Sequence, residues 1–295
     1  MSAPSRQTRL AGRHALVDDI PFTMPVHSKD TPALMAAFPI DAAAARKLIP
    51  GNEIYPLRLW TRGLLVVTVV DYRVTNIGRY IEYSIALACT HGARPAPRLL
   101  PALLQRTFGT GQYVWDLPVS TEVSVKGGKG MWGMPKHQAN LDFVLGGQWV
   151  SAQYDLDGAM MMRIDVRKPA RAWLPASTSA VNYCSFRGML FKSYIYFGGK
   201  LGFSLFDQSS VRLFIGDHPR MAPLKTLGIS PTPLFAGFFP STAGILDDHF
   251  ECWFNTEADR ISAPMEGMAS VVKLGESQQW LAPPRRAVNW EQGAC

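Results

Sequence analysis

The sequence predicts a mainly β protein, folded as a single sandwich-like or barrel-like domain with a few short helices. Apolar and polar residues alternate with a period of two in many segments of the chain. Twenty-five glycines and 22 prolines are spread over all 295 residues, which favours many short elements over long helices. No repeat or low-complexity linker divides the chain, and β-rich domains can reach this length.

Composition narrows the class of protein. Hydrophobic residues make up 47% and charged residues 18% of the chain, which is typical of a globular protein and excludes a largely disordered one. The net charge of +7 favours an anionic ligand. Because the charges form no sustained run, no nucleic-acid partner is expected.

Cysteine usage and hydropathy predict a cytoplasmic protein. The four cysteines lie too far apart for a paired metal or redox motif and are too few for a disulfide framework. The N-terminus lacks the apolar segment of a secretory signal. The longest apolar stretch, 64–70, is far shorter than the roughly 20 residues of a membrane span, so no membrane partner is expected.

The individual elements follow in chain order. Residues 1–20 read as a flexible arm, 21–282 as the single domain and 283–295 as a C-terminal tail. A helix is predicted from Ala42 to Leu48, capped by Asp41 and ended by Pro50 and Gly51. A second helix is predicted over 98–108, and strands over 63–73, 79–89, 191–197, 210–215 and 248–254.

The clearest strand signal lies between residues 138 and 167. Three alternating segments, 139–145, 150–156 and 160–166, are separated by the turn dipeptides Gly146-Gly147 and Asp157-Gly158. Hairpin dipeptides between segments of period two predict a three-stranded antiparallel meander.

Several common catalytic motifs are absent. The sequence has no GxSxG nucleophile elbow and no HExxH zinc motif. The glycine-rich stretch 127–130 lacks the spacing of a phosphate-binding P-loop. No cofactor and no metal are therefore expected.

One stretch stands out chemically, residues 128–136, which read GKGMWGMPK. Pro135 suits the first position of a strand, where its missing N–H is tolerated. Lys136 would then begin the strand that leads into the meander, in a strongly apolar neighbourhood. Taken alone, a lysine at such a position is usually a solvated surface residue.

This stretch resembles the segment that carries the Schiff-base lysine in the acetoacetate decarboxylase superfamily. The segment Gly78-Arg79-Tyr80-Ile81-Glu82 is similar to the family's G-x-Y-x-E. Two further similarities, in family order, are the segment 45–50, ARKLIP, and the stretch 212–224, with its RL, DH and MAPL. The resemblance covers roughly residues 20–260.

The resemblance implies an acetoacetate decarboxylase-like β-barrel of antiparallel strands, a homo-oligomer and a keto-acid substrate. It assigns Lys136 as the nucleophile and Glu82 as the group that moves protons or positions the substrate. Tyr80, Trp132, Met134 and Arg212 are predicted to line the substrate pocket.

The chemistry sets a condition on such a lysine. An amine attacks a ketone only when neutral, whereas an ordinary lysine has a pKa of about 10.4. Desolvation or a nearby cation activates lysines of this kind. The protonated imine then acts as an electron sink, so that a β-keto acid loses CO2, or pyruvate loses a proton and attacks an aldehyde.

Four positions depart from the family pattern. Where the family has an arginine that helps to form the site, this chain has Thr31 nearby, and where it has an acidic residue on an early strand, this chain has Val67. The family's acidic residue in the glycine-rich segment is replaced by Gly130, and its second lysine by His137. Neighbouring strand residues point to opposite faces, so His137 is expected to lie away from the amine and exposed.

These departures leave several functions open. Decarboxylation of an acetoacetate-like β-keto acid is favoured. A pyruvate aldolase-dehydratase, a hydratase or a cyclase of the same superfamily is the first alternative. A barrel that binds a small molecule without turnover is the second.

Overall fold

The computed structural model describes residues 13–169, 174–254 and 281–284. Residues 1–12 of the expected arm and 285–295 of the expected tail lie outside the described residues. Although a flexible arm is predicted as far as residue 20, residues 13–20 form β1 (Arg13–Val17) and the start of β2 (Ile20–Met24). These two strands pair as an antiparallel hairpin.

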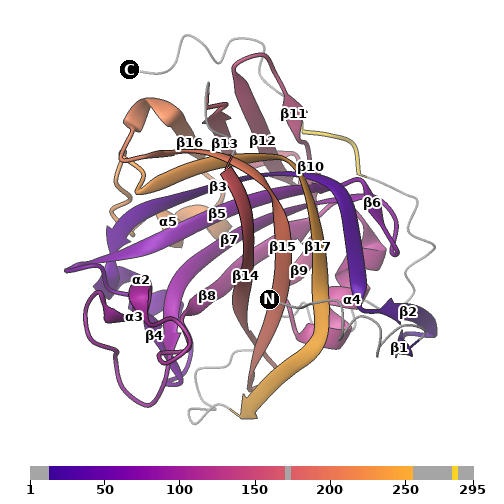
Figure 1. Cartoon of the computed structure of the whole chain (residues 1–295), viewed down its shortest axis with the longest axis horizontal. Helices are drawn as coiled ribbons and strands as arrows, with labels where there is room; N and C mark the ends of the chain where they lie inside the picture. The colour runs from indigo at the N-terminus through magenta and orange to yellow at the C-terminus, as the bar shows by residue number, and fades with distance from the viewer. Residues whose placement is uncertain (1–12, 170–173, 255–280, 285–295) are drawn as a thin grey trace.

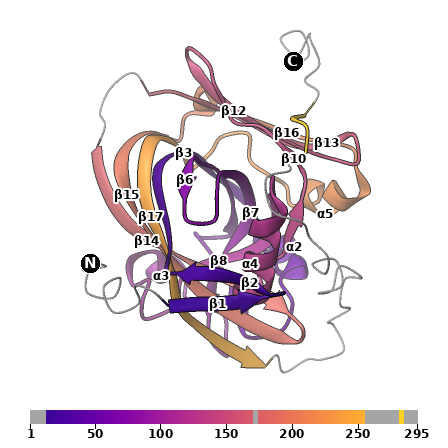
Figure 2. The same ribbon diagram turned by 90° about the vertical axis from the view of Figure 1, so that its right-hand side faces the viewer.

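The largest sheet of the described residues has ten strands and curves into a ring (Figure 1). Around the ring, neighbours follow in the order β7, β5, β3, β17, β15, β14 and β8, and β8 pairs with β7 again. Figure 2, turned by 90°, shows the sheet curving back on itself. The strands of this sheet are β3 (Val26–Asp41), β4 (Ile54–Pro56), β5 (Arg62–Tyr72), β6 (Val74–Thr75), β7 (Tyr80–His91), β8 (Gly111–Val119), β9 (Lys136–Gln138), β14 (Leu174–Phe186), β15 (Met189–Leu205) and β17 (Phe235–Phe254).

The ring is split at one point, where β8 changes partner along its length. The start of β8 pairs in parallel with β14, through Gln112 opposite Asn182. The end of β8 pairs in parallel with β9, through Leu117 opposite Lys136. The other pairings around the ring are antiparallel.

A smaller sheet of five strands lies against the ring. Its strands are β10 (Asn140–Leu141), β11 (Val144–Leu145), β12 (Trp149–Leu156), β13 (Ala159–Arg167) and β16 (Val211–Ile215). The predicted meander is confirmed, although its first segment is broken into β10 and β11. Asp157 and Gly158, both with positive φ, form the turn between β12 and β13.

The main hydrophobic core lies between the two sheets. It joins alternate residues of β3, β5 and β7, among them Phe38, Val67 and Tyr83, to Tyr154 of β12 and Ile164 of β13. Since side chains alternate across a strand, the other residues of β3, β5 and β7 face the inside of the ring. The outer face of the ring therefore packs the core, and its inner face is available for a site.

The helices within the described part of the chain are short. They are α2 (Ala42–Leu48), α3 (Leu100–Leu103), α4 (Glu122–Trp132) and α5 (Ala222–Lys225), with 3-10 turns at Gln208–Ser210 and Pro219–Met221. The prediction of α2 is confirmed, because Asp41 accepts a hydrogen bond from the Ala44 amide at 2.7 Å. The helix predicted over 98–108 spans only α3. Its N-cap, Leu99, has a φ of +66° and makes no side-chain capping bond, and Leu103 is 80% exposed, so little burial supports a longer helix.

Candidate active site

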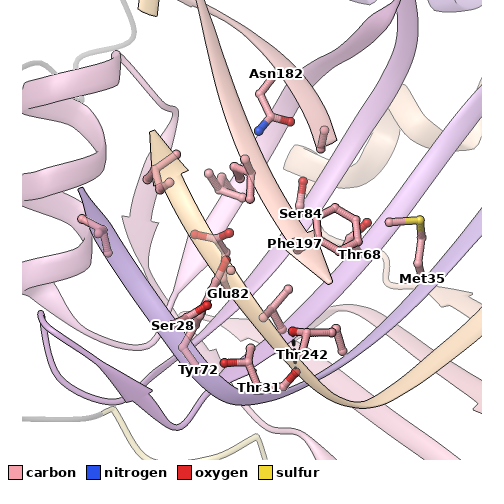
Figure 3. A pocket seen from close by; sticks show the side chains of 18 of the residues that line it. Ser28, Thr31, Met35, Thr68, Tyr72, Glu82, Ser84, Asn182, Phe197 and Thr242 are labelled. Carbon is pink, nitrogen blue, oxygen red and sulfur yellow. Dashed lines mark hydrogen bonds between the residues drawn. The ribbon is translucent and has the colours of Figure 1, made fainter. Parts of the chain in front are cut away.

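A cavity of about 110 Å³ lies inside the ring, lined by residues of β3, β5, β7, β8, β9, β14, β15 and β17 (Figure 3). Its wall is largely apolar and includes Val70, Phe197 and Phe239. Of the described residues that line it, only Lys136 and Glu82 belong to the charged types. The cavity is thus a largely apolar chamber with one pair of charged residues in its wall.

Strands β5 and β7 supply three successive pairs of side chains to this cavity. The antiparallel register places Tyr72 opposite Tyr80, Val70 opposite Glu82, and Thr68 opposite Ser84. Same-face residues of one strand are spaced by about 7 Å. The cavity wall is therefore ordered along the strands as an aromatic pair, a carboxylate and a pair of hydroxyls.

Lys136 enters the cavity from the split in the ring. Its residue exposure is 3%. Its Nζ lies 2.7 Å from Glu82 Oε2 and donates a hydrogen bond to Ser124 Oγ at 3.0 Å. The same nitrogen lies 5.4 Å from the centroid of the Tyr80 ring. The amine is thus buried, with a carboxylate in reach to exchange its proton.

Helix α4 shapes the path of this lysine. Ser124 and Gly128, four residues apart, lie on one face of the helix. A Cβ atom at Gly128 would lie 2.3 Å from Lys136 Cδ and 2.7 Å from its Cε. The lysine side chain therefore crosses the helix at Gly128 and reaches Ser124 one turn away. Gly133, with a φ of +62°, ends the helix and turns the chain toward β9.

Two phenols and a thiol near the lysine, those of Tyr72, Tyr80 and Cys184, are held in their neutral forms. Burial, and then the charge of Glu82, raises the pKa of Tyr72 and of Tyr80 well above the ordinary value. The two rings stack with centroids 4.5 Å apart. Burial also raises the pKa of the Cys184 thiol to about 12. At neutral pH the phenols can therefore donate hydrogen bonds, and Cys184 is not a thiolate nucleophile.

His137 lies on the opposite face of β9 from Lys136, as strand alternation predicts. Its Nε2 lies 2.9 Å from Asp116 Oδ1, which also accepts a hydrogen bond from Arg220 Nη2 at 2.8 Å. Burial favours the protonated form of Asp116, but His137 and Arg220 outweigh it and hold the pKa of that carboxyl below its ordinary value. The expectation of an exposed histidine is wrong, since its side chain is only 11% exposed.

The predicted site residues fall into two groups. Lys136, Glu82, Tyr80 and Met134 line the cavity together. Trp132 and Arg212 do not line it. Trp132 packs with apolar residues of β3, β8 and β14 at the split in the ring, and Arg212 lies on β16 with its guanidinium carbon 4.4 Å from the Trp149 ring centroid. Sequence similarity alone could not separate these packing positions from pocket positions.

The structure also shows where the other three positions that depart from the family pattern lie. Thr31 lines the cavity and donates a hydrogen bond to the Lys29 carbonyl oxygen. Val67 packs in the core between the two sheets. A Cβ at Gly130 would lie 2.5 Å from Val17, so this glycine lets the β1–β2 hairpin pack closely on α4.

The sequence interpretation missed Ser124, Gly128, Tyr72, Thr68 and Ser84. Three glycines within 127–130 hid the helix that carries Ser124, because glycine has low helix propensity. Tyr72, Thr68 and Ser84 lie on strands that were predicted. The register between the two strands, which sets the pairs, was the missing information.

Two negative findings concern the described residues. Within 13–169, 174–254 and 281–284, no group of three or more His, Cys, Asp or Glu side chains is placed to hold a metal ion. In the same part of the chain, no helix has the length and apolar character needed to cross a membrane.

Comparison with known proteins identifies a family and a shared fold. The family described as acetoacetate decarboxylase (ADC) matches residues 10–187. No curated protein sequence matches the chain. A solved acetoacetate decarboxylase is 15% identical, with a TM-score of 0.54 over 79% of this chain and 90% of its own.

Two other solved structures share the fold. The acetoacetate decarboxylase from Legionella pneumophila is 12% identical, with a TM-score of 0.57 over 87% of this chain and 93% of its own. The enduracididine biosynthesis enzyme MppR, with HEPES bound, is 14% identical, with a TM-score of 0.55 over 79% of this chain and 89% of its own. At these identities the likeness concerns the fold.

Proposed function

Because the chain belongs to the acetoacetate decarboxylase family, we propose that it is a lyase that forms a Schiff base between Lys136 and a keto acid. The observation that carries the proposal is the placement of Lys136 Nζ. This nitrogen is buried, faces an apolar cavity and lies 2.7 Å from the Glu82 carboxylate. A surface lysine, the ordinary alternative, would have none of these properties.

Imine formation uses the pair of charged residues. Glu82 takes a proton from the Lys136 ammonium, and the neutral amine attacks the keto carbon. A carbon–nitrogen bond forms, Glu82 returns its proton to the former carbonyl oxygen, and that oxygen leaves as water. The Ser124 hydroxyl, 3.0 Å from Nζ, orients the amine. The product is a protonated imine on Lys136.

Decarboxylation is the favoured next step. The bond between the α-carbon and the carboxylate breaks, its electron pair forms the enamine double bond, and CO2 leaves. A proton then adds to the α-carbon, and water hydrolyses the imine to release the ketone and the free amine. The loss of CO2 removes a negative charge, so an apolar wall without a second cation among its described residues favours it.

An aldol-type reaction is the second candidate. MppR, which shares the fold, has been solved with pyruvate and with the condensation product of pyruvate and imidazole 4-carboxaldehyde. On Lys136, a pyruvate imine would lose a methyl proton rather than CO2. Exchange of the pyruvate methyl protons with deuterium oxide, followed by NMR, would detect that step.

The source of the product oxygen tests the imine route. If acetoacetate is decarboxylated through Lys136, acetone released in ¹⁸O-labelled water must carry the labelled oxygen at the first turnover. Lys136→Ala is the control, in which the slow exchange of the oxygen of free acetone with labelled water is measured. Release of unlabelled acetone would refute the Schiff-base mechanism. If the protein neither releases acetone nor exchanges the pyruvate protons, two options remain: a bulkier keto substrate, or the barrel that binds without turnover.

A further inference from the structure

The cavity extends beyond the reach of a small keto acid bound at Lys136. The pair Thr68 and Ser84 lies one step further along β5 and β7 than Val70 and Glu82. That step is about 7 Å, and an extended chain advances by roughly 1.2 Å per bond. With its keto carbon on Lys136, acetoacetate has a single methyl carbon on the side away from its carboxylate and cannot span this distance.

The far end of the cavity carries a hydroxyl for which the described residues provide no hydrogen-bond partner. Thr68 Oγ1 is buried and has no hydrogen-bond partner within the described residues. Ser84 stands opposite it in the register, and both side chains line the cavity (Figure 3). Buried hydroxyls nearly always have a partner. Rotation about the Thr68 Cα–Cβ bond would turn this unpartnered hydroxyl toward an oxygen of a ligand in the cavity.

Apolar side chains line the cavity beside the Thr68–Ser84 pair. Val70 follows Thr68 on the same face of β5, and Met35 of β3 stands beside Thr68 in the register. These side chains suit methylene groups. A ligand that fills the cavity would therefore present a carbonyl at Lys136, an apolar chain past Val70, and an acceptor oxygen at the two hydroxyls.

We propose that Thr68 and Ser84 form a subsite for the substrate tail. The substrate is then a ketone or 3-oxo acid larger than acetoacetate, with a second acceptor oxygen about five bonds from the reacting keto carbon. This inference rests on the proposed function of Lys136, since the chain length is counted from the Val70–Glu82 pair, where Lys136 Nζ lies 2.7 Å from Glu82 Oε2. The hydroxyls donate to the tail oxygen and fix the direction in which the chain lies.

Borohydride trapping with two matched ketones tests the subsite. 6-Methoxyhexan-2-one and octan-2-one differ only in an ether oxygen that replaces one methylene, about five bonds from the keto carbon. The rate of adduct formation on Lys136 is measured for each ketone. In Thr68→Val, which keeps the side-chain shape, the preference for the ether over the alkyl ketone should fall by about 3- to 10-fold.

A matched control isolates the effect of the cavity. Thr121 Oγ1 is also buried without a partner in the described part of the chain, but Thr121 does not line the cavity. Thr121→Val should leave the preference unchanged. Trapping of octan-2-one by Thr68→Val serves as the check that the variant folds.

The outcomes separate the two proposals when acetoacetate is trapped in parallel. An unchanged preference in Thr68→Val would overturn the subsite and leave the Schiff-base function standing. If acetoacetate forms an adduct but neither longer ketone does, the subsite is likewise overturned and the Schiff-base function stands. The absence of any adduct on Lys136 would overturn both proposals together.

Discussion

Gly128 is the position at which a single added methyl group should disable the lysine while the fold is kept. A Cβ there would lie 2.3 Å from Lys136 Cδ and 2.7 Å from Cε. Carbon atoms in favourable contact are separated by about 3.5–4.0 Å. In Gly128→Ala the lysine side chain must therefore move by more than about 1 Å, and its Nζ leaves its place beside Glu82.

The magnitude follows from the cost of misplacing a reacting group. A displacement of about 1 Å lowers a rate by roughly 100-fold, so we expect kcat/KM to fall by about that factor. Stability should change little. Alanine is favoured over glycine inside a helix by roughly 0.5–1 kcal/mol, which offsets part of the strain from the displaced lysine.

The assay is the initial rate of ketone release from a β-keto acid, with thermal unfolding measured on the same samples. Gly127→Ala is the matched control. Gly127 lies in the same helix, and the three atoms nearest to its added Cβ would belong to Phe22 and Met131, with Phe22 Cε1 at 2.9 Å, and not to Lys136. Activity of Gly128→Ala within a factor of three of the wild type, or an equal loss in both variants, would refute this account of the glycine.

Three further predictions concern the charged groups around the lysine. Glu82→Gln keeps the shape but removes proton transfer, so turnover should fall by about 10²- to 10⁴-fold in the ketone-release assay; a loss below threefold would exclude the assigned role. Burial alone would raise the pKa of Asp116, but the contacts with His137 and Arg220 outweigh burial, so the pKa of this carboxyl lies below its ordinary value. The carboxylate therefore stabilises the fold fully above about pH 4 and loses that effect as the pH falls through its folded pKa. Asp116→Asn should flatten the acid limb of the unfolding free energy measured in urea between about pH 5 and pH 2, whereas a limb parallel to the wild type would contradict the ion pair. His137→Lys should change turnover by less than about threefold, because this side chain points toward Asp116 and away from the amine; a large gain would show that a second lysine can act from this position.

The sequence predicted the elements that depend on local patterns. The helix α2 follows from its cap at Asp41, and the β12–β13 hairpin follows from Asp157-Gly158. Pro135 predicted Lys136 at the start of a strand, the strand predicted over 79–89 contains Glu82, and the resemblance to the family supplied the roles of both residues. Both meet in one cavity because β7 and β9 flank β8.

What the sequence did not show depends on long-range register and on close packing. The split in the ring arises where β8 exchanges β14 for β9, two partners that lie far apart in the chain. The glycines of α4 look like a loop in isolation. They are needed because Lys136, Phe22 and Val17 each pack against the helix where a side chain would stand. Such contacts are visible only after folding.

The central claim is that Lys136 forms an imine with a carbonyl substrate. The most direct measurement is borohydride reduction of the protein with acetoacetate and, separately, with pyruvate, with the modified peptide identified by mass spectrometry. Lys126 provides an internal comparison, since it is as buried as Lys136 but lies 3.5 Å from Asp18 and does not line the cavity. We predict a reduced adduct on Lys136, none on Lys126, and none in Lys136→Ala. An adduct that persists in Lys136→Ala, or the absence of an adduct with every carbonyl compound tried, would contradict the Schiff-base account.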